Sequence, residues 1–280
     1  MQHILGLVGS ERKLGNGEIL VKAAAAACGE PFMLELIRLT ELNLQPCRGC
    51  YTCLIPGKRC PIQDDLYFLT DKIKTADAII LAAPCYALGP AAITKLFTDR
   101  IIAVAQLLDE FWGKPCTIIG TYGIPGWEGN SLSVLTAGMR FMGFAVKDSA
   151  LFLGALPGEC LEMPGAVERI NKLGAALLGE PRQAEAGQCP TCWSDVWRFP
   201  QPGKVVCPFC GQQGELSAGP AGVTWVFGPS GARFKRDQLQ EHFHKWLKGK
   251  MEEYMLRRKE LAVIRNQYKG MDTWLKPDAQ

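Results

Sequence analysis

The alternation of short apolar runs with helical segments is the feature that most constrains the fold of this chain. Between residues 3 and 179, each apolar run is followed by a segment with helical periodicity. Buried strands that alternate with helices form a parallel sheet covered on both faces. The expected strands are 3–10, 32–39, 77–83, 116–122 and 144–153, and the expected helices are 17–28, 64–76, 90–108, 130–143 and 165–179.

Five such units within residues 1–180 predict an α/β domain with a flavodoxin-like, doubly wound, five-stranded parallel sheet. In this fold a ligand lies at the carboxyl ends of the strands. The loops after the first, third and fourth strands are therefore the candidate binding loops. Asp64 or Asp65 is suited to cap helix 64–76.

The rest of the chain predicts two appendages, a four-cysteine metal ribbon over 181–232 and a basic amphipathic helical tail over 233–280. A polar linker at 179–188 precedes the ribbon, and residues 223–234 resemble a short hairpin. Apolar residues at helical spacing predict one long helix over 237–268. Residues 233–276 carry twelve Lys or Arg against six Asp or Glu, so the tail is basic although the whole chain is only +3.

The expected cellular compartment decides how the twelve cysteines are interpreted. No uncharged apolar run is long enough to span a membrane, and the N-terminus lacks the pattern of a signal peptide. We therefore expect a cytoplasmic protein, in which structural disulfides are disfavoured. Eight cysteines form two tight groups that need another explanation, and the scattered four are expected to be buried apolar residues.

The loop after the first strand, GSERKLGNG, has the composition of a phosphate site. It leads into a helix, whose free backbone N–H groups and dipole attract an anion. An ordinary turn with a solvated basic pair is the alternative, because neither common phosphate fingerprint is present. The candidate phosphate ligands are Ser10, Arg12, Lys13, Asn16 and Gly17.

The loops after the third and fourth strands favour a planar ring. Both are irregular and contain glycine and aromatic residues, so they offer backbone amides and flat surfaces at the same sheet edge. Together with the first loop they predict a mononucleotide site. The candidate residues are Pro84, Cys85, Tyr86, Ala87, Leu88, Gly89, Thr121, Tyr122 and Gly123.

The first cysteine group, Cys47, Cys50, Cys53 and Cys60, has the spacing C-x2-C-x2-C-x6-C. Compact C-x2-C-x2-C runs are typical of 4Fe–4S ligation. Zinc sites more often consist of two separated knuckles. The spacing therefore favours a 4Fe–4S cluster, with a loop that holds no cluster as the alternative.

The second group forms two C-P-x-C knuckles, Cys189 with Cys192 and Cys207 with Cys210. Such pairs indicate a tetrahedral metal site with four thiolate ligands. Zinc in a ribbon is favoured over a single rubredoxin-like iron, because Trp193 stands where rubredoxin has glycine.

Residues 3–180 resemble the flavodoxin-fold NAD(P)H-dependent FMN reductase superfamily, and more narrowly its iron–sulfur flavoproteins. The motifs GSERKLGNG, APCYALGPAAITKLFTDR and the cysteine loop running into Asp64–Asp65 carry this resemblance. It implies FMN, with the phosphate at Ser10, Arg12 and Asn16 and the ring at 84–89 and 121–123. It also implies a 4Fe–4S cluster, a ferredoxin-like donor and a homo-oligomer. Gly17 departs from the Ser or Thr of many relatives.

The predicted function is therefore electron transfer through a 4Fe–4S cluster and FMN, between a one-electron donor and an acceptor. One alternative is an NAD(P)H-dependent FMN or quinone reductase without a cluster. Another is a redox-sensing protein whose ribbon and tail bind nucleic acid or a protein partner. The tail mixes Glu and large apolar residues with its basic ones, which makes packing on another subunit or on a partner a better interpretation than nucleic-acid binding.

Overall fold

The computed structural model describes residues 1–219 and 222–271. The chain divides into two compact units, residues 1–239 and 240–280. The first unit contains the sheet and the four-cysteine ribbon, and the described part of the second is largely helical. Among the described residues, no helix combines the length and apolar character needed to cross a bilayer.

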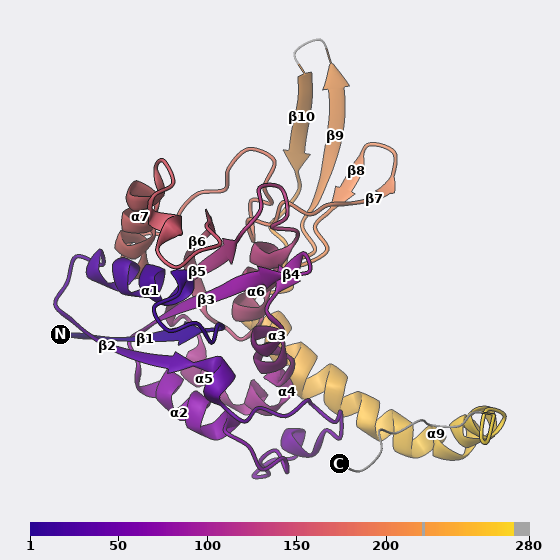
Figure 1. The fold of residues 1–280 in the computed structure, drawn as a ribbon. Coiled ribbons are helices and arrows are strands. Elements are labelled where there is room, and N and C mark those ends of the chain that lie inside the picture. Colours follow the sequence, from indigo (N-terminus) through magenta and orange to yellow (C-terminus); the bar gives the residue numbers. More distant parts are fainter. Residues whose placement is uncertain (220–221, 272–280) are drawn as a thin grey trace. The chain divides into compact units, whose positions relative to one another are not determined.

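The predicted five-stranded parallel sheet is confirmed (Figure 1). Its strand order is β2-β1-β3-β5-β6, so the chain moves outward from β1 to β2 and then crosses to β3 on the other side. This reversal creates the switch point at which doubly wound folds bind ligands. The strands are β1 (Gln2–Val8), β2 (Phe32–Arg38), β3 (Ala78–Tyr86), β5 (Pro115–Tyr122) and β6 (Ala145–Leu153), and the two-residue β4 (Gly89–Pro90) pairs antiparallel with the end of β3.

The inner strands direct alternate side chains into two apolar cores. Along β1, Ile4 and Val8 lie in the core beneath helices α1 (Asn16–Ala26) and α7 (Ala166–Leu178), whereas Leu5 and Leu7 lie in the opposite core. Continuous apolar runs are therefore required, because both faces of these strands are buried. The helices of the first face are α1 (Asn16–Ala26) and α7 (Ala166–Leu178), and those of the second are α2 (Leu66–Thr75), α3 (Ala92–Asp99), α4 (Ile101–Val104), α5 (Leu108–Phe111) and α6 (Ser131–Phe141).

The single helix predicted over 90–108 is wrong. Helix α3 ends at Asp99, and α4, the 3-10 turn η3 (Ala105–Leu107) and α5 follow as short pieces. At Arg100 the backbone N–H bonds the Phe97 carbonyl three residues back, which tightens the turn and ends the helix. The Arg100 side chain then turns into the protein and is fully buried. Apolar spacing continues through the break, so periodicity alone predicts one helix.

The aspartates before α2 serve a different purpose from the capping that we expected. Asp65 makes no side-chain cap; its carboxylate accepts the Asn43 backbone N–H at 2.7 Å. Asp64 accepts the Leu66 N–H at 3.3 Å and, at the shorter distance of 2.9 Å, that of Gln45. Both carboxylates therefore fix the chain segment that leads into the first cysteine loop. The other short 3-10 turns of this unit are η1 (Leu39–Glu41), η2 (Thr52–Leu54) and η4 (Glu159–Leu161).

The ribbon contains a separate antiparallel sheet of order β10-β9-β8-β7. The hairpin predicted at 223–234 is displaced, because the strand over 222–227 pairs with the strand before it. The register brings Gly222 opposite Gly219, and residues 228–234 form no strand. The four strands are β7 (Arg198–Gln201), β8 (Lys204–Val206), β9 (Gln213–Gly219) and β10 (Gly222–Phe227).

The predicted C-terminal helix spans residues 236–266 and contains a π-helical segment. Helix α8 (Arg236–Gln240) leads into the π segment η5 (Glu241–Leu247), which leads into α9 (Lys248–Asn266). No residue of α9 is buried, and its apolar side chains Met255, Leu256 and Val263 are exposed.

Candidate functional site

A cavity of about 580 Å³ lies at the carboxyl ends of β1, β3, β5 and β6. It brings together twelve of the fourteen residues predicted to bind the cofactor, namely Ser10, Arg12, Asn16, Gly17, Pro84, Cys85, Tyr86, Ala87, Leu88, Thr121, Tyr122 and Gly123. Lys13 and Gly89 are not among its lining residues. Ile124, Trp127, Gly154 and Ala155 line it without having been predicted.

The first loop presents the start of helix α1 to this cavity. Leu14 adopts the left-handed conformation (φ 49°), and Gly15 follows as the extended N-cap residue. Gly15 places no capping side chain over the helix end, so the first-turn amides of residues 16–18 keep the free N–H groups that every helix start leaves. These donors and the helix dipole make the end an anion site.

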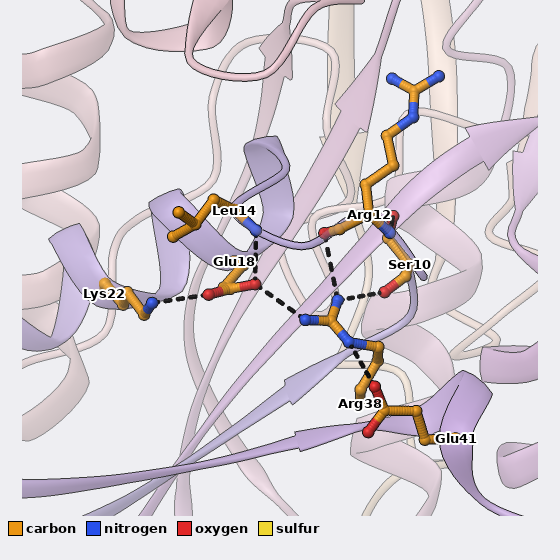
Figure 2. Close-up of polar contacts among 7 residues, drawn as sticks. All are labelled: Ser10, Arg12, Leu14, Glu18, Lys22, Arg38 and Glu41. Atoms are coloured by element: carbon orange, nitrogen blue, oxygen red, sulfur yellow. Dashed lines mark hydrogen bonds and ion pairs between the residues drawn. The ribbon is translucent and has the colours of Figure 1, made fainter.

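Buried charges hold the first loop in place (Figure 2). The Arg38 guanidinium, from the end of β2, donates to the Ser10 carbonyl at 2.7 Å and to the Arg12 carbonyl at 3.2 Å. It also pairs with Glu18 at 3.0 Å, and the same carboxylate oxygen accepts the Leu14 N–H at 2.9 Å. The ammonium of Lys22 and these other donors lower the pKa of Glu18 to about 2. The loop is therefore built before any ligand binds.

Two polar side chains of the first loop, those of Arg12 and Asn16, reach across to the segment after β6. The Asn16 amide donates to the Gly154 carbonyl and accepts the Gly158 N–H, both at 2.8 Å. Arg12 donates to the Ala155 carbonyl at 2.8 Å. The Asn16 side chain thus closes one wall of the cavity. Because that side chain is already hydrogen-bonded, the group that Asn16 can offer to a phosphate is its backbone N–H. Lys13 is exposed and is not one of the residues that line the cavity.

The second loop is a tight hairpin between β3 and β4. Tyr86 pairs with Gly89, and the two residues between them, Ala87 (φ 48°) and Leu88 (φ 64°), are both left-handed. This is the backbone of a two-residue hairpin turn, which normally uses Asn or Gly. Non-glycine residues cost about 1 kcal/mol or more each there, and such strain concentrates at functional sites. Tyr86 and Leu88 are both more than half exposed at the cavity.

The third loop holds that hairpin from behind. The Asn130 N–H donates to the Leu88 carbonyl at 3.0 Å, and the Cys85 thiol lies 3.3 Å from the Glu128 carbonyl. Gly129 (φ 53°) packs so closely that a Cβ there would lie 2.1 Å from the Leu88 oxygen. The loop thereby brings the exposed indole of Trp127 to the cavity.

The cavity residues that the sequence analysis missed follow from the fold. Ile124 and Trp127 belong to the third loop, beyond the three residues singled out there. Gly154 and Ala155 come directly after β6, whose carboxyl end borders β5. The loop after the fifth predicted strand was the signal for them, because parallel neighbours end at one edge.

These residues fit a flavin mononucleotide. The phosphate group matches the helix start beside Ser10 and Arg12, and an apolar slot with backbone donors and acceptors, flanked by Tyr86 and Trp127, suits a flat heterocycle. The left-handed hairpin residues Ala87 and Leu88 both line this slot.

The first cysteine loop lies between β2 and α2. Cys47 and Cys50 are exposed, Cys60 is half-buried and Cys53 is buried. Burial, followed by the neighbouring thiol groups of Cys60, Cys50 and Cys47, raises the pKa of Cys53 to about 11. A thiolate at Cys53 near neutral pH therefore needs positive charge beside it, which a bound metal would supply.

The sulfurs of this loop are not gathered around a single-ion position, in contrast to those of the ribbon. Four thiols are the donor set that iron–sulfur clusters take, so the ligand chemistry of the loop is compatible with a cluster. The loop is anchored from α3–η3: Gln106 donates to the carbonyls of Cys53, Ile55 and Lys58, and Arg100 bonds the Cys60 sulfur.

The ribbon brings its four predicted metal ligands together. The sulfurs of Cys189, Cys192, Cys207 and Cys210 lie within 4.8 Å of one another and are buried. Metal–sulfur bonds of about 2.3 Å place four sulfurs at such separations around one tetrahedral ion. Among the described groups of His, Cys, Asp and Glu, this is the one with single-ion geometry.

The two knuckles share one backbone shape. Gly211 follows the second knuckle with φ 82°, and Trp193 follows the first with φ 64°. The predicted departure from glycine at Trp193 has a structural counterpart: its indole ring is nearly buried in the core of the sheet domain. The guanidinium carbons of Arg140 and Arg182 each lie 4.4 Å from the ring centroid. Packing therefore compensates for backbone strain.

The fold and this cavity define a flavodoxin-like, flavin-binding oxidoreductase. Residues 2–154, more than half of the chain, match the model of the NADPH-dependent FMN reductase family. The chain belongs to this family, and its relatives include iron–sulfur flavoproteins. One, from Methanocaldococcus jannaschii, is 42% identical over 98 residues, which are 35% of this chain and half of that protein's length. Another, from Archaeoglobus fulgidus, is 31% identical over 163 residues, 55% of this chain and 70% of that protein.

A solved flavone reductase is similar along its whole length. It covers 99% of this chain and 100% of its own, with a TM-score of 0.69 and 20% identity. At that identity the likeness shows a shared fold. Membership of the NADPH-dependent FMN reductase family makes this protein a flavin-dependent oxidoreductase by class.

Proposed function

We propose that the protein binds FMN in the cavity and a 4Fe–4S cluster on residues 47–60, and carries electrons between a ferredoxin-like donor and an acceptor. The observation that carries this proposal is one compact unit holding both a preformed anion site at the switch point and an anchored four-thiol loop. When bound, the cluster handles single electrons and the flavin one or two. Relatives named iron–sulfur flavoproteins support the same assignment.

The chain's own contribution is to hold the two groups. The start of α1, with Ser10 and Arg12, binds the phosphate, and Arg38 keeps that loop from rearranging. The hairpin at 86–89 and Trp127 enclose the ring. Cys47, Cys50, Cys53 and Cys60 are the proposed cluster ligands, with Gln106 tying down the segment between Cys53 and Cys60.

For the ribbon we propose structural zinc, with a single iron as the alternative. Four buried sulfurs within 4.8 Å suit either ion. Zinc is favoured because Trp193 stands where rubredoxin has glycine, and its side chain docks on the sheet domain.

A reductase that uses NAD(P)H and holds no cluster is the second candidate function. The name of the matched family favours it, and so does the exposure of Cys47 and Cys50. This candidate predicts flavin that NAD(P)H bleaches rapidly, with no acid-labile sulfide. The first proposal predicts slow bleaching by NAD(P)H and rapid reduction by reduced ferredoxin.

The proposed partners are a ferredoxin-like donor and further copies of this chain in the cytoplasm. The exposed apolar side chains of α9, such as Met255 and Val263, suit packing on a second copy. Binding of nucleic acid by the ribbon and tail would instead appear as affinity that falls steeply with salt.

The experiment is a count of iron, acid-labile sulfide, zinc and FMN per chain, on protein purified without oxygen. About four irons, four sulfides, one zinc and one FMN are expected. Flavin without sulfide would replace the electron carrier by the reductase. A fifth iron without zinc would make the ribbon rubredoxin-like.

A further inference from the structure

Arg100 is a fully buried cation directly beneath the first cysteine loop. It stands at the break between α3 and α4, and its side chain and that of Asp64 are both completely shielded from solvent. Its Nη1 donates to the Gln45 carbonyl at 2.7 Å and to Asp64. Its Nη2 lies 3.4 Å from both Asp64 Oδ1 and the sulfur of Cys60. Within the described part of the chain, Nε has no partner.

The contact with Cys60 distinguishes Arg100 from an ordinary buried ion pair. Asp64 alone would balance its charge, and buried pairs of this kind add little net stability. The Arg100 guanidinium instead bridges the Asp64 carboxylate and the Cys60 sulfur. A thiolate or a metal-bound sulfur accepts such a bond far better than a neutral thiol, because charge-assisted hydrogen bonds are about twice as strong.

Cys60 is fixed so that its sulfur meets this donor. Its backbone N–H bonds the Tyr67 hydroxyl at 2.7 Å, which sets the chain direction at this residue. Asp64 is fixed as well, by the N–H groups of Gln45 and Leu66. Arg100, Cys60 and Asp64 are thus all held in place by hydrogen bonds to groups other than the cysteine side chains of the loop.

We propose that Arg100 is the positioning residue that sets the reduction potential of the cluster, through its hydrogen bond to the Cys60 sulfur. This inference rests on the proposed function. Reduction adds a negative charge to a cluster, and hydrogen bonds to its sulfurs and nearby charge stabilise the reduced form. The effect is large in a buried site, where water does not screen it. Arg100 therefore raises the potential.

The loop offers a matched control. Arg59 is the neighbour of Cys60 in sequence, but it is exposed and lies over the Tyr67 ring at 4.7 Å. R59Q removes the same charge from the same vicinity without touching a sulfur.

The experiment is a redox titration of the cluster, followed by electron paramagnetic resonance, on full-length protein with the iron and sulfide content measured in each sample. The variants are R100K and the double variant D64N/R100Q, which leaves no buried unpaired charge. We expect both variants to keep the cluster and to show a lower reduction potential. In the double variant the equilibrium constant for one-electron reduction should fall at least tenfold, which lowers the potential by about 59 mV or more. R59Q should match the wild type.

Three results would overturn the proposal. Unchanged potentials in R100K and D64N/R100Q with intact clusters would show that Arg100 does not set the potential. Loss of iron from both variants would make it a residue that only holds the loop. Wild-type protein without iron or sulfide would instead overturn the proposed function itself, and this is measured before any variant is titrated.

Discussion

At the scale of single residues, Gly129 occupies a position that no side chain can share. A Cβ there would meet the Leu88 carbonyl oxygen at 2.1 Å and its carbon at 2.6 Å, and both belong to backbone that cannot rotate away. The contact couples the third loop to the hairpin that encloses the cavity. Gly126, in the same loop, has a similar positive φ and nothing within 4 Å.

We therefore expect Gly129→Ala to destabilise the protein and weaken FMN binding, and Gly126→Ala to lose only the backbone term of about 1 kcal/mol. Urea denaturation and titration of the apoprotein with FMN, followed by flavin fluorescence, measure the two effects. Equal losses in both variants would show that the close contact with Leu88 is unimportant.

Glu18 links the stability of the first loop to pH. Hydrogen bonds from Lys22, the Leu14 N–H and Arg38, opposed in part by burial, lower its pKa from 4.5 to about 2. The ionised form therefore stabilises the fold fully above pH 4.5, and this contribution is lost as the pH falls from 4.5 towards 2.

The Glu18→Gln variant is expected to be less stable than the wild type at pH 7 by about 1–3 kcal/mol and to converge with it near pH 2. Chemical denaturation at pH 7, 4 and 3 measures this difference. Glu11→Gln, at an exposed position of the same loop, is the control. A difference between wild type and Glu18→Gln that stays constant with pH would contradict the assignment.

At the scale of elements, the ribbon is joined to the sheet domain through α6. Trp193 is nearly buried between Arg140 and Arg182, and Ser133 of α6 donates to the Asp195 carboxylate at 2.9 Å. The ribbon that carries the four-cysteine site thus also contributes an aromatic side chain to the core of the sheet domain.

Trp193→Ala is expected to lower the free energy of unfolding by about 3–5 kcal/mol, the usual cost of removing a buried Trp. Trp193→Gly should lose about 1 kcal/mol less at this left-handed position despite its smaller side chain, because glycine accepts the backbone conformation. Guanidinium denaturation measures both. Phe199→Ala, at an exposed ribbon residue, should change little, and a comparable loss there would contradict specific docking.

At the scale of the whole molecule, the cavity proposed for flavin and the four-cysteine site of the ribbon are separate. They share no lining or ligand residue, and both belong to the unit over residues 1–239. The ribbon and the sheet domain stabilise each other through the core that includes Trp193. The residues proposed to contact the flavin are different from those proposed to contact the metal.

Removal of the ribbon metal, by chelation or by Cys207→Ser, is expected to lower the unfolding temperature while FMN stays bound at 25 °C. Zinc content, visible circular dichroism of the flavin and thermal melts follow the three quantities. Cys28→Ser, at a buried cysteine outside both groups, is the control. Simultaneous loss of zinc and flavin would show that the cavity depends on the ribbon.

The sequence by itself determined the parallel sheet and most of the cavity. Runs such as 3–10 and 77–83 are apolar at every position that both faces of a buried strand require, and this signal is local. Parallel strands end at one edge, so the loops holding Ser10, Tyr86 and Tyr122 had to meet there. The C-P-x-C knuckles likewise predicted the convergence of their four sulfurs.

Only the tertiary structure decided the contacts between distant segments. Arg100 bonds Cys60 and Asp64, and Arg38 supports the loop that begins at Ser10. Trp193 of the ribbon packs into the core of the sheet domain. None of these contacts has a periodic or short-range signal, because each depends on how far separated parts of the chain pack. Helix 90–108 breaks for the same reason: its apolar spacing is continuous, and the buried partner of Arg100 lies thirty-six residues away.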